Sequence, residues 1–208
     1  MKTRPSHTGR LMVLGLASLV PYLYALRLQD LRQRTVEFEV AFFVAFALYS
    51  GATTLVLRVK TLSSRAVVAF FGLAVVMQAP LVFTRPTLSD DMYRYVWDGR
   101  VQAQGISPYR YPPDEPELSA LREGQVWRFI NRKSDITVYP PGAESAYALL
   151  WRVWPDSVRW FQIAMALGGL VAAGLLVGLL RALNLSPARA LIFLWSPLLA
   201  FEPAPAAH

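Results

Sequence analysis

Residues 40–57 read VAFFVAFALYSGATTLVL, an uncharged run that is too apolar for the surface of a water-soluble protein. Three further uncharged runs of similar length occupy Leu11–Leu26, Ala66–Thr84 and Trp160–Leu180. A helix needs about 20 residues to cross the hydrocarbon core of a bilayer, and somewhat fewer where flanking Arg and Lys side chains reach outward. These four runs therefore predict membrane-spanning helices.

A fifth uncharged run, Ala190–Phe201, is shorter and is followed by Glu202. We expect three spanning helices in residues 1–85, an extracytoplasmic loop in 86–158, and two further spanning helices in 159–208, of which the last is truncated. The predicted fold class is all-α. It is a polytopic membrane helical bundle whose large extracytoplasmic loop contains short interfacial helices.

The net charge of +7 would suit a nucleic-acid-binding protein, but the charges are arranged as in a membrane protein. Segments 1–10, 58–65 and 181–189 contain basic residues and no acidic ones, whereas 27–39 and 85–159 each balance to zero. Basic residues accumulate in cytoplasmic segments. We therefore predict a multi-pass protein of the plasma (inner) membrane with a cytoplasmic N-terminus and an extracytoplasmic 86–158 loop, and no nucleic-acid partner.

Several classes of enzyme lack their characteristic residues in this sequence. It contains no cysteine and only two histidines, and it has no HExxH, P-loop or GxGxxG motif. A disulfide framework is excluded, and metallohydrolase and NTPase activities have no support. We predict no cofactor and no metal ligand, although the sequence leaves a divalent ion open.

The highest density of candidate functional side chains is in SDDMYRYVWDGR, residues 89–100, directly after the third predicted span. Ser89, Asp90 or Asp91 could cap a helix here, and no proline follows before residue 104. These features predict a helix over about 91–104, which Gly105 ends. One face of that helix would carry Asp91, Arg94, Tyr95 and Asp98. A carboxylate at the membrane boundary could act as a general base, with Arg neutralising a phosphate.

The same residues also have a structural interpretation. In that alternative, Asp90 caps the helix, Arg94 pairs with Asp91 and Asp98, and the aromatic residues form an interfacial belt.

Two more helices are expected in the loop, at about 115–130 and at 143–154. Tyr139-Pro140-Pro141-Gly142 opens the second of these, since proline is tolerated in the first turn of a helix. The 143–154 helix contains Glu144 and Arg152 and is too short to cross. We therefore expect it to be interfacial or partly inserted.

Other candidate binding residues each have a structural alternative. Arg110, Arg132 and Lys133 could bind phosphate or be solvated loop charges. Tyr109, Tyr111 and Tyr139 could stack on a sugar ring or anchor the neighbouring prolines by packing. Glu202 and His208 lie in or beside the last apolar run, where an ionisable group often has a functional partner, or they are exposed to water.

Three motifs together resemble those of the GT-C glycosyltransferases. They are Asp90–Arg100, Gly105-Ile106-Ser107-Pro108-Tyr109 and Tyr139-Pro140-Pro141. The likeness is greatest to polyprenol-phosphate-sugar-dependent bacterial enzymes, including the mycobacterial-type alpha-mannosyltransferases, and covers about 85–208. Trp195-Ser196-Pro197-Leu198, with Glu202 and His208, resembles a later helix of that family.

The resemblance implies an inverting transfer of a sugar, with mannose favoured, from a polyprenyl-phosphate donor to a hydroxyl of a glycan or glycolipid acceptor. Asp91 or Asp90 would be the base, and membrane lipid a further partner. The predicted substrate-binding residues are Arg94, Tyr95, Asp98, Arg100, Tyr109, Arg110, Lys133, Tyr139, Glu202 and His208. Relatives often have Gln where Glu144 stands, and they have more spans. We therefore expect an N-terminal fragment, for which activity in isolation is not assured.

Two other functions are weighed against this one. A transporter or lipid flippase would use charged residues inside its spans, whereas the four predicted spans contain none. A non-catalytic membrane scaffold would point Asp91 and Arg94 towards water, whereas an enzyme would turn them into a cavity.

Overall fold

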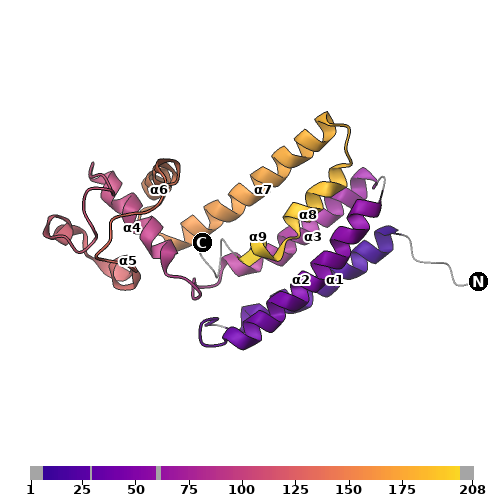
Figure 1. The fold of residues 1–208 in the computed structure, drawn as a ribbon, viewed down its shortest axis with the longest axis horizontal. Coiled ribbons are helices and arrows are strands. Elements are labelled where there is room, and N and C mark those ends of the chain that lie inside the picture. The colour runs from indigo at the N-terminus through magenta and orange to yellow at the C-terminus, as the bar shows by residue number, and fades with distance from the viewer. Residues whose placement is uncertain (1–6, 29, 60–61, 202–208) are drawn as a thin grey trace, which may run out of the picture. The chain divides into compact units, whose positions relative to one another are not determined.

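The computed structural model describes residues 7–28, 30–59 and 62–201, and within these ranges it contains helices and no strand. The predicted candidates Glu202 and His208 lie outside the described residues. The chain divides into two compact units, which are described separately (Figure 1). The second unit extends from Leu88 to Ala164, and the first unit contains the chain on either side of it.

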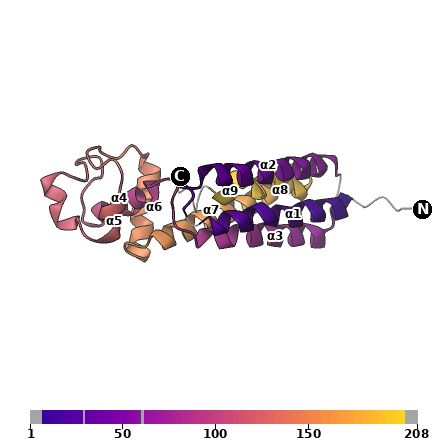
Figure 2. The ribbon, with the colours of Figure 1, turned by 90° about the horizontal axis from the view of Figure 1, so that it is seen from below.

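The first unit is a bundle of long apolar helices with three short helical segments at its C-terminal end (Figures 1 and 2). Four helices of the described residues are long and apolar enough to cross a membrane, as the sequence predicted. The predicted all-α membrane bundle is thereby confirmed. The elements are α1 (His7–Arg27), α2 (Thr35–Arg58), α3 (Ser64–Val82), the greater part of α7 (Val158–Ala182), η2 (Pro187–Arg189), α8 (Ala190–Leu194) and α9 (Pro197–Phe201).

The core of this bundle is centred on Trp195. Its indole packs edge-on against Phe70 at a centroid distance of 5.6 Å, and its Nε1 donates to the carbonyl of Phe70 at 3.0 Å. Large apolar side chains on the opposite faces remain exposed, including Phe43, Val68 and Leu175. An apolar exterior around a packed interior is what a bilayer solvent requires.

The last apolar run differs from the expected single helix, because it is divided in the described residues. Proline at 197 has no N–H to continue the helix, so α8 ends at Leu194 and α9 begins at Pro197. Two carbonyls near the break accept side-chain hydrogen bonds: Ile192 from Tyr49 at 2.9 Å and Leu194 from Gln78 at 2.7 Å. Pairing these carbonyls within the bundle is what makes a broken helix tolerable in an apolar surrounding.

The second unit contains two packed helices and the loops around them. It is formed by α4 (Asp91–Ala103), η1 (Pro116–Leu121), α5 (Gly124–Phe129), α6 (Pro141–Val153) and the start of α7. The predicted helices over 91–104 and 143–154 correspond to α4 and α6. The single helix expected over 115–130 is wrong, because residues 122–123 separate the 3-10 helix η1 from α5.

Helix α4 ends where the sequence predicted, at Gly105. This glycine has a φ of +74°, its N–H donates to the carbonyl of Gln102, and the N–H of Ile106 donates to the carbonyl of Val101. This pair of bonds is the Schellman motif, which satisfies carbonyls at a helix end and favours glycine at the left-handed position. The chain then leaves the helix towards Tyr109.

A second glycine sets how closely α4 and α6 approach each other. A Cβ atom at position 99 would lie 2.6 Å from the backbone oxygen of Tyr147 and 2.9 Å from Cβ of Trp151. Both neighbours are rigid parts of α6, so neither can move aside at low cost. Gly99 is therefore required by packing rather than by backbone conformation.

We predict that Gly99→Ala separates α4 from α6 and lowers the free energy of unfolding by about 1–3 kcal/mol, the usual cost of overpacking. Thermal unfolding of the purified protein in detergent measures this effect. Gly142→Ala is the matched control, because a Cβ at that α6 position meets nothing within 4 Å. Equal midpoints for the two variants would contradict the packing role of Gly99.

Candidate functional site

Helix α4 carries three charged residues into the interior of the second unit. Arg94, Asp98 and Arg100 are buried together with the apolar residues Met92 and Val96. Charged side chains are rarely buried unless they are paired and hydrogen-bonded. The partners of these three residues therefore determine what the helix can do.

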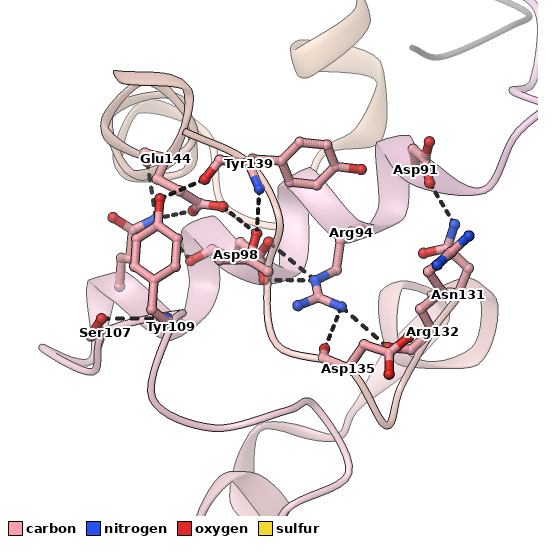
Figure 3. A network of polar contacts seen from close by, with 12 residues as sticks. Asp91, Arg94, Asp98, Ser107, Tyr109, Asn131, Arg132, Asp135, Tyr139 and Glu144 are labelled. Carbon is pink, nitrogen blue, oxygen red and sulfur yellow. Dashed lines mark hydrogen bonds and ion pairs between the residues drawn. The ribbon is translucent and has the colours of Figure 1, made fainter. Parts of the chain in front are cut away.

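Arg94 is held by several groups within the unit (Figure 3). Its Nε lies 2.9 and 3.1 Å from the two carboxylate oxygens of Asp98, one turn later on α4. Its Nη1 donates to the backbone carbonyls of Asp135 at 3.0 Å and Arg132 at 3.3 Å. Arg94 thus joins α4 to the 131–135 loop, which is a structural use of the guanidinium.

Asp98 and Glu144 form a buried pair of carboxyl groups between α4 and α6. Asp98 is 1% exposed and Glu144 is 2% exposed. The Glu144 oxygens accept from Thr137 Oγ1 at 2.7 Å and from Gln102 Nε2 at 2.8 Å. The two carboxyl groups are close enough to interact electrostatically.

Glu144 takes up a proton more readily than a glutamate in water does. Burial, followed by the negative charge of Asp98, raises the pKa of Glu144 to about 7. Burial also raises the pKa of Asp98, but the Arg94 guanidinium opposes that effect. Protonation of Glu144 removes the repulsion between the two carboxylates, and Asp98 pairs with Arg94.

Asp91 lies in the first turn of α4, away from the carboxyl pair, and contacts the 131–135 loop. Its Oδ1 accepts from Nδ2 of Asn131 at 2.5 Å, and its backbone N–H donates to Ser89 Oγ at 3.1 Å (Figure 3). Asp90 is at the N-cap position of α4, but its side chain does not cap the helix. The predicted capping role of Asp90 is therefore wrong.

A pocket of about 680 Å³ opens beside Asp91. Its walls come from the start of α4 and from the segment that precedes α6. The lining residues are Asp91, Arg94, Asn131, Arg132, Ser134, Asp135, Ile136, Val138 and Tyr139. Asp91 and Arg94 thus face a pocket, which is the arrangement expected of an enzyme rather than of a scaffold.

Tyrosines form the apolar boundary between this pocket and α6. Tyr95 stacks on Tyr147 at a centroid distance of 4.6 Å and meets Tyr139 edge-on at 4.9 Å. Burial raises the pKa of all three hydroxyls, so they remain protonated donors. Tyr109 is more exposed, and its hydroxyl donates to the carbonyl of Tyr139 at 2.5 Å, which connects the 105–109 and 139–141 motifs.

Three basic residues that the sequence grouped with the site lie elsewhere in the second unit. Arg100 is bound to Asp156 at 2.7 Å and to the carbonyls of Leu121 and Glu123. Arg110 lies over the ring of Tyr111, and Lys133 lies over the ring of Trp127. None of the three lines the pocket beside Asp91.

Sequence reasoning missed three members of the polar network. Asn131, Thr137 and Gln102 have no local pattern that marks them, since their partners are 40, 7 and 42 residues away. Glu144 was noted as a charge on a short helix and as a position where relatives often have Gln, but not as a member of this network. In the described residues, no group of three or more His, Asp and Glu side chains is placed to hold a metal ion.

The comparisons with known proteins are consistent with the motifs. Residues 11–208 match the family model described as alpha-(1->6)-mannopyranosyltransferase, N-terminal domain. No curated protein and no solved structure matches the chain. The family match includes both units and all of the residues around the pocket.

The carboxyl pair predicts a pH-dependent stability. Because folding raises the pKa of Glu144 from 4.5 to about 7, the folded protein binds more protons than the unfolded chain between these values. The stability that this proton contributes is fully present below pH 4.5 and is lost as the pH rises through 7. We expect Glu144→Gln to flatten the fall in thermal midpoint between pH 5 and 8.

A second variant separates titration from hydrogen bonding. Glu144→Ala also removes the titrating group, but it leaves the buried Thr137 hydroxyl without its acceptor and removes one acceptor of the Gln102 amide, so it should lower the midpoint at every pH. A slope in Glu144→Gln equal to that of the parent protein would show that Glu144 is not the group responsible.

Proposed function

Because the chain belongs to the alpha-(1->6)-mannopyranosyltransferase family, we propose that it takes part in transferring mannose from a polyprenyl-phosphate donor to an acceptor hydroxyl. The reaction would take place on the extracytoplasmic face of the plasma membrane, with a glycan or glycolipid as the acceptor. A GT-C type of enzyme suits these features, since four helices are long enough to anchor the protein next to a lipid-linked substrate.

The observation that carries the proposal is the position of Asp91 at a pocket next to a polar, partly basic loop. As the acceptor oxygen attacks the anomeric carbon, its proton passes to the Asp91 carboxylate. The bond between the anomeric carbon and the phosphate oxygen breaks, and its electrons remain on the phosphate. Attack opposite to the leaving phosphate inverts the anomeric configuration.

The arrangement favours Asp91 over Asp90 as the base. Asp91 lines the pocket, whereas Asp90 does not. Arg132 also lines the pocket and is exposed, so it is the guanidinium best placed to neutralise a phosphate. Arg94, by contrast, is occupied by Asp98 and by two carbonyls.

We expect Asp91→Asn to reduce mannosyl transfer by about 10²–10⁴-fold, the usual contribution of a general base. The assay is mannose transfer in membranes that contain the protein. Asp90→Asn should have a much smaller effect. Transfer at the parent rate by both variants would exclude the proposed mechanism.

Topology can be tested with single cysteines, because the chain has none of its own. Ser119→Cys, exposed in η1, should react in sealed cells with a membrane-impermeant maleimide if the loop is extracytoplasmic. Ser64→Cys, exposed at the start of α3, should react only after permeabilisation. The opposite labelling pattern would place the second unit in the cytoplasm and exclude a reaction on the outer face.

A further inference from the structure

The contact between Asn131 and Asp91 joins two residues that are 40 positions apart in the chain. Asn131 follows the buried Ile130 at the end of α5, whereas Asp91 opens α4. At 2.5 Å between Nδ2 and Oδ1, it is among the shortest side-chain hydrogen bonds in the second unit. A hydrogen bond from an amide to an ionised carboxylate is charge-assisted and stronger than one between neutral groups.

The segment that presents Asn131 is fixed from several directions. Arg94 binds the carbonyls of Arg132 and Asp135. The N–H of Asp114 donates to the carbonyl of Lys133 at 3.0 Å. Arg132 has a φ of +43°, a sparsely populated conformation that persists only where surrounding contacts impose it. The Asn131 amide is therefore held in place before any substrate binds.

An amide suits the support of a carboxylate base better than a cation would. The terminal torsion of an aspartate side chain is broad, so an unsupported Asp91 carboxylate would rotate between many orientations. An Asn side chain donates a hydrogen bond and fixes that rotation. It carries no charge, so it does not form an ion pair that would oppose proton uptake by the carboxylate.

We propose that Asn131 is a positioning residue for Asp91, an inference that rests on the proposed role of Asp91 as the base. Asn131 orients the carboxylate towards the acceptor hydroxyl. Arg94 contributes indirectly, because it holds the loop that carries Asn131. The effect of Asn131 is exerted on the chemical step. Donor binding depends on other pocket residues and should be changed little.

The test compares Asn131→Ala and Asn131→Asp in membranes that contain the protein. Asn131→Ala is expected to lower kcat by about 10–10²-fold, the scale of a misplaced catalytic group, with the donor KM within about threefold of the parent value. Asn131→Asp should lower kcat further, because a carboxylate cannot donate and repels Asp91. Gln125→Ala, an exposed α5 residue outside the pocket, is the control and should retain the parent kcat.

Thermal midpoints of the purified variants separate positioning from folding. A lowered kcat with a parent-like midpoint supports the proposal, whereas loss of kcat only in proportion to loss of folded protein overturns it. Parent-like kcat in Asn131→Ala, or a higher kcat in Asn131→Asp than in Asn131→Ala, also overturns it. If Asp91→Asn is inactive while Asn131→Ala is fully active, only the role of Asn131 fails. If Asp91→Asn is active, the proposed function fails first.

Discussion

The second unit depends on a single buried anion, the carboxylate of Asp98. Both of its oxygens are bound by Nε of Arg94, and Glu144 is buried close enough for the two carboxyl groups to interact electrostatically. Burying such a charge costs several kcal/mol unless its partners are well placed. Here Asp98 and Arg94 come from consecutive turns of α4, while Glu144 comes from α6 and accepts a hydrogen bond from Gln102 of α4. Gly99 allows the close approach that this contact requires.

The same charge controls the geometry of the pocket. Arg94 can bind the carbonyls of Arg132 and Asp135 because Asp98 fixes its guanidinium. Glu144 accepts from Thr137, two residues before Tyr139, so the carboxyl pair also anchors the other end of the wall. The 131–139 segment is thus tied at both ends to buried side chains. In this cysteine-free chain, hydrogen bonds hold the segment in place, a role that disulfides have in many extracytoplasmic proteins.

Local chemistry made much of this fold predictable. Uncharged runs predicted the four long helices, Gly105 predicted the end of α4, and Pro140-Pro141 predicted the start of α6. The partners of buried charges were not predictable, because they depend on contacts between distant segments. Arg100 could not be distinguished from a phosphate ligand until Asp156 was seen beside it. Pro197 indicates a helix break, but the continuous apolar composition of the run favoured the expectation of a single helix.

The formal charges around the pocket separate the two substrates of the proposed reaction. Arg94 is paired with Asp98, so the other charged side chains on the wall are Asp91, Asp135 and Arg132. Such a wall carries a net negative formal charge, which suits the hydroxyl groups of an acceptor sugar and opposes a phosphate. A donor phosphate would therefore approach from the side of Arg132, while the acceptor occupies the side of Asp91 and Tyr139. Under the proposed mechanism, that division would place the base next to the hydroxyl that it deprotonates and would keep the two anions apart.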